Sequence, residues 1–567
     1  MKLVIRNQKG TIMTTNKTYR SILNQVRGLA QSPVDAKLGA YAAHLMTESG
    51  GTYETSVAER CEDDELRRHL LDNSSAYEPI SNALATFPAD SLREYVLDSA
   101  TDKGTMRFAA DYTTFNSMAA LAHRILDIKD EDRVADLCCG VGCFLSSTSR
   151  ETSASFYGME ANRQVALVAR AKAALLDNKF TVETGDVLTS TPKQAFDKVF
   201  SDLPLNMRTA NFTKKDGLYD LEKICNKGYG FIQDASWLFA IAANESLAEG
   251  GRALLIMTIG ALSNGTDYHA RRRLVENHCI KSVIALPSGI VPGTNAPVAA
   301  VLLEKNEDYC VRMVDATDLA VPGRRWDTLG EVEIGEIMHR LDESSDKSRL
   351  VTWDELTDIT SLAPSRYLGR EVRMANPTPL GDVATAIDRG ILLPASKLDE
   401  LATTEETRCR YLKLSDIEDG IIGNDLTRLR EIDPKAERHC LRNGDLVVSK
   451  NGSPFKVAVA ETDDETKIAV NGNAYIVRLD PQKADPYYVA AFLVSEDGKA
   501  TMAREATGTT VPGLPLANLR RMEIPLPSLA EQRRIGETYR RSLDRIRELR
   551  RKLESAREHA ASVYTRE

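Results

Sequence analysis

The chain has 567 residues, enough for three or four domains at about 150 residues each. Hydrophobic residues make up 42% and charged residues 27%, an ordinary globular balance that excludes a chain disordered throughout. The 73 Lys and Arg residues against 82 Asp and Glu residues give a net charge of −9, which excludes a uniformly basic nucleic-acid coat but not a local basic face.

The sequence shows no pattern typical of a membrane span, a secretory signal or a metal site. No apolar run approaches the ~18 residues that a membrane-spanning helix needs, and the first residues lack an apolar stretch with a small-residue cleavage site. The nine cysteines are too sparse for a disulfide scaffold, and no pair shows metal-ligand spacing. We therefore expect a cytoplasmic, multidomain protein with no membrane contact and no metal site.

Residues 1–105 are predicted to form a helical N-terminal domain. Apolar residues recur at helical spacing in SILNQVRGLAQSPVDAKLGAYAAHL and again in DDELRRHLLDNSSAYEPISNALATF. No residue in this region suggests chemistry, so the pattern favours a packing or docking domain.

Residues 106–310 show short strand-like runs that alternate with helical stretches. The seven runs are RVADLCC, SFYGME, FTVETGD, KVFSDLP, RALLIMT, KSVIALP and VAAVLLEK. Such alternation predicts a Rossmann-like α/β domain around a mainly parallel, seven-stranded sheet. The loop SGIVPGTNAP between the last two runs has no helical periodicity, which favours an antiparallel final hairpin.

The remaining chain divides into three segments. Residues 311–376 carry charged helical pieces and end at ANPTP, which predicts a connector, and residues 377–529 show short β-type runs with turn signals, which predict an α+β domain. Residues 530–567 predict one long amphipathic helix whose apolar seam needs a partner. The seam has spacings of three or four: Ile535, Tyr539, Leu543, Ile546, Leu549 and Leu553.

A glycine-rich turn, DLCCGVGCFL, follows the first predicted strand. Gly140 and Gly142 allow a tight turn and a close approach of the backbone to a ligand, and the following helix offers free N–H groups. Glu160 follows Gly140 by twenty residues at the end of the next strand, where a carboxylate is suited to a ribose diol. With Asp136 and Asp186, three acids at successive strand ends are expected to converge in one crevice.

Two details narrow the ligand class. Position 145 is Leu where a dinucleotide fingerprint has Gly or Ala, which disfavours NAD and favours a nucleoside cofactor without a pyrophosphate. Cys138, Cys139 and Cys143 admit an alternative interpretation as redox or metal-binding groups. Because adjacent strand residues point to opposite faces and no fourth ligand lies nearby, small residues packed beside the turn are favoured.

These motifs resemble the S-adenosylmethionine-dependent N6-adenine DNA methyltransferases, specifically the modification subunits of type I restriction–modification systems. DLCCGVGCFL looks like the cofactor element of that family, and DYTTFNSMAALAHRIL is similar to its (Tyr/Phe)-Thr-Pro helix entry. The resemblance covers about residues 14–305 and implies S-adenosyl-L-methionine as the cofactor. The cofactor-binding residues that it implies are Tyr112, Thr113, Asp136, Cys138, Gly140, Gly142, Glu160, Asp186 and Asp202.

The catalytic loop of the family reads Asn/Asp-Pro-Pro-aromatic after the fourth strand, and here it reads Asp202-Leu203-Pro204-Leu205. Asp202 keeps a carboxylate that accepts hydrogen bonds from an adenine amino group. Leu205 stands where the family has a ring that stacks on a flipped-out adenine, and such stacking is worth roughly 1–3 kcal/mol. The resemblance assigns Asp202, Pro204 and Leu205 to catalysis, with Phe212 or Tyr219 as alternative stacking rings.

From Leu380 onward the chain resembles the specificity subunits of the same systems, most specifically in GTTVPGLPLANLRRMEIPLPSLAEQRRI. The alternative is a small β-rich accessory domain. A reader of duplex DNA needs cations for phosphates and polar groups for base edges. The candidates for DNA contact are Lys450, Asn451, Lys456, Thr507, Thr509, Thr510, Arg520 and Arg521.

Type I specificity subunits, by resemblance, carry two target-recognition domains, whereas this chain has one such domain and one long helix. We therefore expect a homodimer through the C-terminal helix, on double-stranded DNA with a two-fold bipartite site. The alternative is a helix that folds back on its own domain.

The sequence as a whole predicts a site-specific adenine-N6 DNA methyltransferase of a type I-like restriction–modification or phage-defence system, with a restriction nuclease or translocase subunit as a candidate partner. A non-catalytic, cofactor-sensing DNA-binding subunit is the first alternative, motivated by Leu203 and Leu205. An RNA or protein methyltransferase is disfavoured by the specificity-like C-terminal half.

Overall fold

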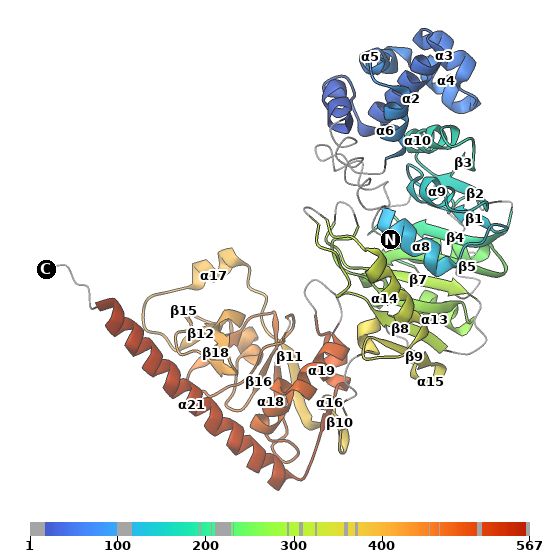
Figure 1. Ribbon diagram of the computed structural model, residues 1–567. Helices are drawn as coiled ribbons and strands as arrows, with labels where there is room; N and C mark the ends of the chain where they lie inside the picture. Colours follow the sequence, from blue (N-terminus) through green and yellow to red (C-terminus); the bar gives the residue numbers. More distant parts are fainter. Residues whose placement is uncertain are drawn as a thin grey trace. The chain divides into compact units, whose positions relative to one another are not determined.

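The computed structural model divides into two compact units, which we call the N-terminal unit (Met1–Pro364) and the C-terminal unit (Ser365–Glu567). Figure 1 shows the chain coloured along its sequence. The described residues are 18–98, 116–190, 192, 194–205, 207–209, 228, 230, 232–291, 294–304, 310–323, 326–356, 361–368, 372, 374–452, 454–463, 465–506 and 513–562.

The described part of residues 1–105 is helical, as the apolar periodicity predicts. It contains α2 (Pro33–Ser49), α3 (Tyr53–Arg60), α4 (Asp64–Asp72), α5 (Ser74–Leu84) and α6 (Ala89–Leu97). Ser32, Thr52 and Asp63 each accept a backbone N–H at the start of a helix, which satisfies donors that the first turn leaves free. These helices share one hydrophobic core with the following α/β layers.

The N-terminal unit is built on one nine-stranded sheet. In spatial order its strands are β3 (Phe180–Thr184), β2 (Ser155–Glu160), β1 (Arg133–Asp136), β4 (Phe196–Asp202), β5 (Leu247–Thr258), β7 (Val298–Glu304), β6 (Ile280–Ala285), β8 (Cys310–Asp315) and β9 (Ser348–Thr352). All seven predicted runs form strands. The expected antiparallel pairing of the last two is also present, because β7 lies antiparallel between β5 and β6.

The strand count and the expected connector are corrected by β8 and β9. Residues 311–376 contribute β9, most of β8 and the helix α14 (Glu331–Asp342), so the sheet has nine strands rather than seven. In both strands polar side chains are interspersed among the apolar ones, as in CVRMVD for β8 and SRLVT for β9. β9 lies at the edge of the sheet. Such strands lack the continuous apolar run by which a sheet interior is recognised.

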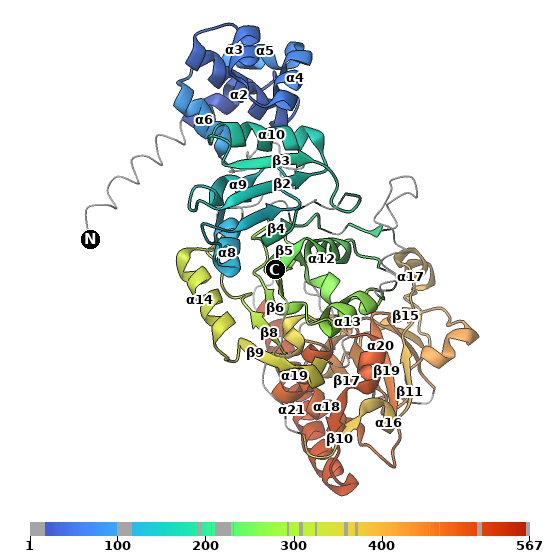
Figure 2. The same ribbon diagram turned by 90° about the vertical axis from the view of Figure 1, so that its right-hand side faces the viewer.

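Helices cover both faces of this sheet. Figure 2 shows α8 (Asn116–Leu126) and α14 on one side, and α12 (Ser236–Glu245) and α13 (Tyr268–Glu276) on the other. The remaining helices are α9 (Cys143–Thr148), α10 (Arg163–Ala174), α15 (Trp353–Leu356) and the 3-10 turn η3 (Ile259–Leu262). Because both faces are covered, the middle of β5, from Ala253 to Met257, is fully buried, which explains its unbroken apolar run.

The C-terminal unit mixes short strands with helices, as expected. A four-stranded sheet has the order β11-β19-β16-β17, a three-stranded sheet the order β15-β12-β18, and β10 pairs with β20 and β13 with β14. The strands are β10 (Pro377–Pro379), β11 (Ala384–Arg389), β12 (Cys409–Leu412), β13 (Ile417–Glu418), β14 (Ile421–Ile422), β15 (Thr427–Leu429), β16 (Leu446–Ser449), β17 (Val457–Val459), β18 (Lys467–Val470), β19 (Ala474–Leu479) and β20 (Glu523–Pro525). The helices are α16 (Leu380–Val383), α17 (Ala395–Leu401), α18 (Pro486–Val494), α19 (Glu496–Glu505), α20 (Leu516–Arg521) and α21 (Leu529–Ser562).

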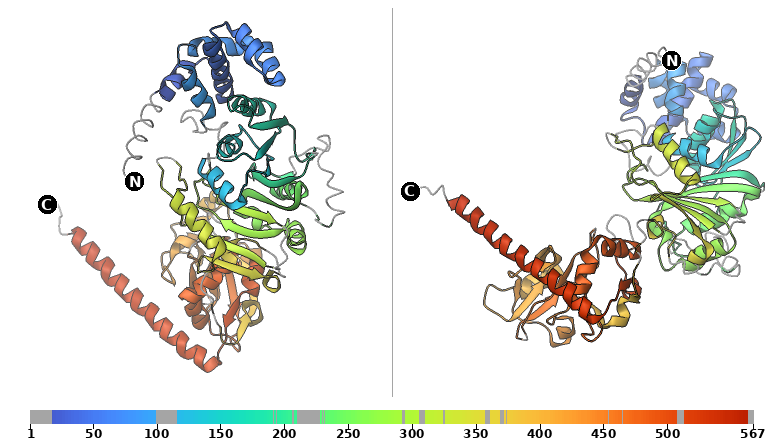
Figure 3. Two further views of the ribbon diagram at one scale, coloured as in Figure 1. Left: turned by 45° about the vertical axis from the view of Figure 1, so that its right-hand side comes forward. Right: turned by 60° about the horizontal axis from the view of Figure 1, so that its bottom comes forward.

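The long helix α21 is present as predicted, and its apolar seam is used in two ways. Ile535 and Tyr539 pack against the core of their own unit, and Leu543 is only 2% exposed. Farther along, Leu549 is 49% and Leu553 is 52% exposed. Figure 3 shows the far end of α21 extending past the other elements of the C-terminal unit. The first half of the seam therefore packs on its own unit, as in the alternative of a helix that folds back. The second half of the seam is exposed.

Among the described residues, no helix has both the length and the apolar character that crossing a membrane would require.

Candidate cofactor and catalytic site

The glycine turn between β1 and α9 is held by Glu160 at the end of β2. Gly140 and Gly142 have positive φ angles of 52° and 74°, and a Cβ on Gly142 would lie 3.0 Å from the Cβ of Ala169. The Gly140 N–H donates to Glu160 Oε2 at 3.0 Å, and the Asn162 N–H donates to Oε1 at 2.8 Å. One carboxylate thus fixes the turn and the start of α10 together.

Four carboxylates gather around this turn at the ends of β1, β2 and β4 and just after β3. Asp136 is almost fully buried, and burial, with the charges of Asp202 and Glu160, raises its pKa well above the usual value. Burial also raises the pKa of Glu160 and that of the Cys138 thiol, and the charges of Asp136, Glu160, Asp186 and Asp202 all act on Cys138. This carboxylate cluster is therefore rich in acceptors and suited to a ligand with hydroxyl, amino or cationic groups.

The other predicted cofactor residues have different placements. Asp186 Oδ1 accepts the N–H of Leu188 at 2.9 Å. Cys138 is partly exposed beside the turn. Tyr112 and Thr113 lie outside the described residues.

The cysteines next to the turn contribute to packing. A Cβ on Gly158 would lie 3.0 Å from the sulfur of Cys139, so this thiol fills the space where β2 passes under the turn. Cys143 is buried, and its sulfur accepts from the ammonium of Lys172 at 3.5 Å. Within the part of the chain that the structure describes, no group of three His, Cys, Asp or Glu side chains has metal-binding geometry.

The predicted catalytic loop continues directly from β4. Asp202 is the last residue of that strand, and the N–H of Leu203 donates to the carbonyl of Ile256 on β5 at 3.3 Å. The side chain of Leu203 is buried, and Leu205 is partly buried against the core of the N-terminal unit. Pro204 is partly buried between them. The two leucines at family proline and ring positions thus serve packing, while the alternative rings Phe212 and Tyr219 lie outside the described residues.

Sequence reasoning missed the polar groups that hold the segment after this loop. Asp267 and Arg271 are both 0% exposed, at the start of α13 and inside it. Their hydrogen bonds reach residues 233 and 234 and the turn after β5. In YHARRRLVE, Arg271 looks like part of a charged helix surface, and Asp267 looks like an ordinary loop residue before it, so no sequence signal marks either residue.

The predicted DNA-contact residues are only partly free of internal roles. Lys456 Nζ donates to the carbonyls of Leu414 and Ile417, both at 2.8 Å. Arg520 Nη2 donates to the carbonyl of Ile387 at 3.2 Å, and Arg521 lies 3.6 Å from Glu505. These three side chains therefore make contacts within their own unit: Lys456 and Arg520 by hydrogen bonds, and Arg521 by an ion pair.

Lys450 and Asn451 have a more open placement at the end of β16. The backbone carbonyl of Lys450 accepts the N–H of Leu514 at 2.7 Å, and Asn451 forms an isolated antiparallel bridge with Gly513. Lys450 and Asn451 therefore lie next to Gly513 and Leu514. Thr507, Thr509 and Thr510 lie outside the described residues. Lys450 forms no ion pair with the described residues of the chain.

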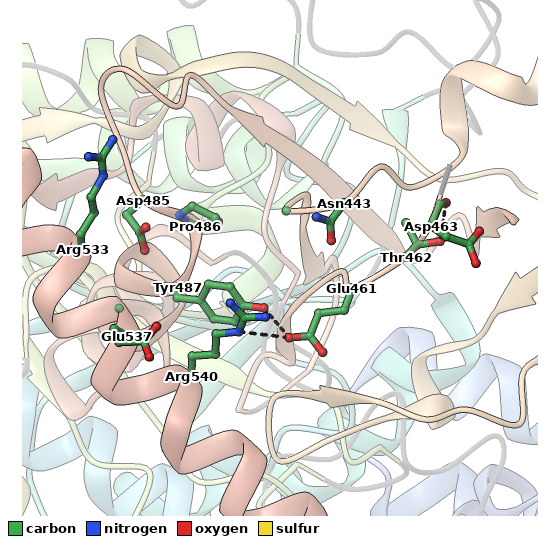
Figure 4. A pocket seen from close by; sticks show the side chains of 12 residues that line it. Asn443, Glu461, Thr462, Asp463, Asp485, Pro486, Tyr487, Arg533, Glu537 and Arg540 are labelled. Atoms are coloured by element: carbon green, nitrogen blue, oxygen red, sulfur yellow. Dashed lines mark hydrogen bonds and ion pairs between the residues drawn. The ribbon is translucent and has the colours of Figure 1, made fainter. Parts of the chain in front are cut away.

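A cleft of about 800 Å³ lies along the first half of α21 (Figure 4). In it the Arg540 guanidinium lies 5.3 Å from the ring centre of Tyr487, and both side chains meet the carboxylate of Glu461. Arg547 adds an ion pair to Glu461 at 2.7 Å. This network fastens α21 to α18, which carries Tyr487, and to the residues just after β17, where Glu461 lies.

Known proteins resemble the N-terminal unit in sequence. Residues 91–373 match the family model described as N-6 DNA Methylase. The methylase subunit of the type I restriction enzyme MpnII from Mycoplasma pneumoniae is 24% identical over 200 residues, which cover 31% of this chain and 36% of that protein. The chain thus spans 36% of the length of this curated relative.

Solved structures with a similar arrangement have lower identity. The methyltransferase subunit of a type I restriction–modification system from Streptococcus thermophilus is 18% identical, covers 59% of this chain and 80% of its own, and gives a TM-score of 0.44. The type IIG restriction endonuclease BpuSI is 13% identical, covers 93% of this chain and 75% of its own, and gives a TM-score of 0.48. The family assignment therefore rests on the family model.

Proposed function

We propose that this chain, which belongs through residues 91–373 to the N-6 DNA methylase family, transfers a methyl group from S-adenosyl-L-methionine to the N6 amino group of adenine in DNA. The observation that carries the proposal is the cluster of four carboxylates around the glycine turn, with Asp202 at the start of the catalytic loop. When bound, the cofactor supplies an electrophilic methyl group on a sulfonium centre.

The carboxylates of this cluster fit that cofactor. A carboxylate has about four acceptor positions, and Glu160 makes backbone hydrogen bonds with Gly140, Ala161 and Asn162, so one position remains for a ribose hydroxyl. Since Asp186 Oδ1 accepts the N–H of Leu188, Oδ2 would accept from the amino group of the cofactor's adenine. The acidic cluster also favours the positive sulfonium, since unlike charges attract.

Asp202 would hold the target base for transfer. Its carboxylate accepts a hydrogen bond from the adenine N6 amino group and stabilises the positive charge that develops there as the new N–C bond forms. Leu205 would contact the face of the base by dispersion alone. Pro204 restricts the backbone between them, since its ring fixes φ.

Detection of N6-methyladenine tests this reaction. The purified full chain is incubated with unmethylated genomic DNA and S-adenosyl-L-methionine, and the digested nucleosides are measured by mass spectrometry. Asp202→Ala is expected to abolish the product. Asp197→Ala is the matched control, because Asp197 lies on the same strand at its other end and pairs with Arg133 at the surface. Product that persists in Asp202→Ala removes this residue from the reaction.

A non-catalytic, cofactor-sensing DNA-binding protein is the second candidate. It is favoured by Leu203 and Leu205, which pack inward at positions where the family has a proline and a ring. Binding of S-adenosyl-L-methionine in calorimetry, with no N6-methyladenine in DNA from cells that express the protein, would support it over the first.

The C-terminal unit is our candidate for reading the DNA sequence. Support comes from its specificity-like motifs and from the Lys450–Asn451 loop, where Asn451 forms a bridge with Gly513. Lys450→Ala should weaken binding to all duplexes alike, because phosphate contacts carry no sequence information. A loss confined to one sequence would instead place Lys450 at a base edge.

We further propose that two chains pair through the second half of α21, which exposes Leu549 and Leu553. Leu543 is unsuited to a test, since it is buried in its own unit. Leu549→Glu with Leu553→Glu should convert a dimer into a monomer in light scattering, with melting unchanged. A parent that is monomeric at micromolar concentration, with and without DNA, defeats the proposal. A restriction subunit is a further proposed partner, by analogy with the type I relative.

A further inference from the structure

Chain segments on both sides of residues 210–227 lie side by side just beyond the catalytic loop. Arg208 forms an antiparallel bridge with Asp234. The Thr209 N–H donates to the carbonyl of Gln233 at 3.0 Å, and the Ala235 N–H donates to the carbonyl of Met207 at 2.9 Å. The loop that begins at Asp202 is thus tied at its far end to residues 232–235.

Residues 232–235 are held in turn by one carboxylate. Asp267 Oδ1 accepts the N–H of Gln233 at 2.5 Å, and Oδ2 accepts the N–H of Asp234 at 3.2 Å. Oδ2 also accepts from the side-chain amide of Asn264 at 2.5 Å, while the Asp267 N–H donates to Asn264 Oδ1 at 2.8 Å. Asp267 is 0% exposed, so these bonds are made out of reach of water, where an unpaired carboxylate would be costly.

The support behind Asp267 is itself buried. Arg271 is 0% exposed and donates to the carbonyls of Ala261 and Asn264. The indole N–H of Trp237 donates to the same Ala261 carbonyl at 2.9 Å. These bonds fix the turn after β5, which continues the strand that pairs with β4. Both ends of the catalytic loop are therefore anchored to β5. Its start bonds to β5 directly, and its far end is held through Asp267 and the turn that follows β5.

We infer that Asp267 is a positioning residue for the methyl transfer proposed above: it clamps residues 232–235, and through them the far end of the Asp202–Leu205 loop. The hydrogen bonds of this clamp do not depend on the proposed function. Only their effect on methyl transfer rests on it. A carboxylate suits this role because it accepts from two backbone N–H groups and one amide at once, whereas an Asn would direct an N–H donor at one of them.

A second contact seats the same segment on α13. Gly230 has a φ of +68°, and a Cβ built on it would lie 2.8 Å from the Cβ of His269. Gly230→Ala should therefore displace the segment without removing any charge, and it provides a second variant that acts on the same clamp.

The test compares Asp267→Asn and Gly230→Ala with the parent by hydrogen–deuterium exchange and by steady-state methylation of unmethylated genomic DNA. We expect faster exchange at Gln233 and Asp234. We also expect kcat to fall about tenfold or more, equivalent to about 1.4 kcal/mol, with the KM for S-adenosyl-L-methionine changed less than about twofold. Asp318→Asn is the matched control, because it removes a carboxylate paired with Arg340 elsewhere in the unit.

The two failures are distinguishable. Unchanged exchange at Gln233 and Asp234 in Asp267→Asn overturns the clamp whether or not the protein methylates DNA. Faster exchange with an unchanged kcat shows a structural contact only and also overturns the positioning role. A parent that shows protected Gln233 and Asp234 but forms no N6-methyladenine overturns the proposed function and leaves the hydrogen-bonded clamp standing. Partial recovery of protection in the exchanged pair Asn264→Asp with Asp267→Asn would support the assignment, since that pair restores one carboxylate between the two positions.

Discussion

Replacing Glu160 by Gln is expected to weaken cofactor binding while leaving the shape of the site nearly unchanged. Both oxygens of Glu160 accept backbone N–H groups, from Gly140 and Asn162. Ala161 makes a further backbone hydrogen bond with this carboxylate, so one acceptor position remains for a ribose hydroxyl. A Gln has one oxygen in place of two, so its amino group would face a backbone donor or a ribose hydroxyl that needs an acceptor.

The size of the effect follows from the charge that is lost. A hydrogen bond to a charged group contributes about 1.5–3 kcal/mol, so losing one should weaken S-adenosyl-L-methionine binding about 10- to 150-fold. Burial raises the pKa of Glu160 above its usual value of 4.5, so the proton that opposes binding is taken up at a higher pH than for an exposed Glu. The affinity of the parent should therefore fall as the pH is lowered through that raised pKa, and the affinity of the Gln variant should not.

Titration calorimetry at several pH values measures both effects. Glu183→Gln is the matched control, because Glu183 lies on the neighbouring β3, where it accepts from the Tyr157 hydroxyl at 2.7 Å near the surface. Equal affinity of the parent and Glu160→Gln at neutral pH would refute the assignment of Glu160 to the ribose. An equal pH dependence in the two proteins would show that another group controls the titration.

Three further predictions concern the loop, the buried charge and the helix. Leu205→Phe should tighten binding to duplex DNA with an unpaired adenine by about tenfold, since base stacking is worth roughly 1–3 kcal/mol; weaker binding would mean that the loop is built around leucine. For Asp136→Asn, the raised pKa of Asp136 means that its contribution to parent stability is full below the usual value of 3.8 and is lost as the pH rises through the raised pKa. The cofactor-free variant should therefore melt higher than the parent at pH 7, and the difference should vanish near pH 3, as followed by calorimetry; a constant difference would contradict this. Glu461→Gln should loosen α21, which Glu461 holds through Tyr487, Arg540 and Arg547. We expect a loss of about 1 kcal/mol and a fall of about 2–4 °C in the melting temperature of its unit, whereas equal melting would show that the apolar seam alone holds the helix.

Local pattern was sufficient to find the elements that carry the proposed site. The seven runs were recognisable as strands because strands that pack in a core carry apolar side chains. β7, inside the sheet, is buried along nearly its whole length, whereas β3, at the sheet edge, alternates buried and exposed residues. The glycine turn and Glu160 were recognisable because tight backbone geometry and a twenty-residue spacing are written in consecutive residues. The C-terminal helix was recognisable from a seam at spacings of three and four.

Tertiary structure decided which of these residues are available to act. Periodicity marks Leu543 and Leu549 alike as seam residues, but one is buried in its own unit and the other is exposed. Lys456 is a lysine of the kind that often binds phosphate, but its ammonium donates to the carbonyls of Leu414 and Ile417. Asp267 reads as an ordinary loop residue, and only the fold brings it to the backbone of Gln233 and Asp234.

What the sequence by itself determined is the set of elements and the identity of the glycine turn, because these depend on neighbours within one turn of helix or one strand. What only the tertiary structure decided is the partner of each element: the place of β7 between β5 and β6, the addition of β8 and β9, and the burial of Asp267. The physical reason is that burial and hydrogen-bond satisfaction are summed over contacts between segments far apart in the chain. The local pattern shows which residues lie on the same face of a helix or strand, but it does not show which other segment packs against that face.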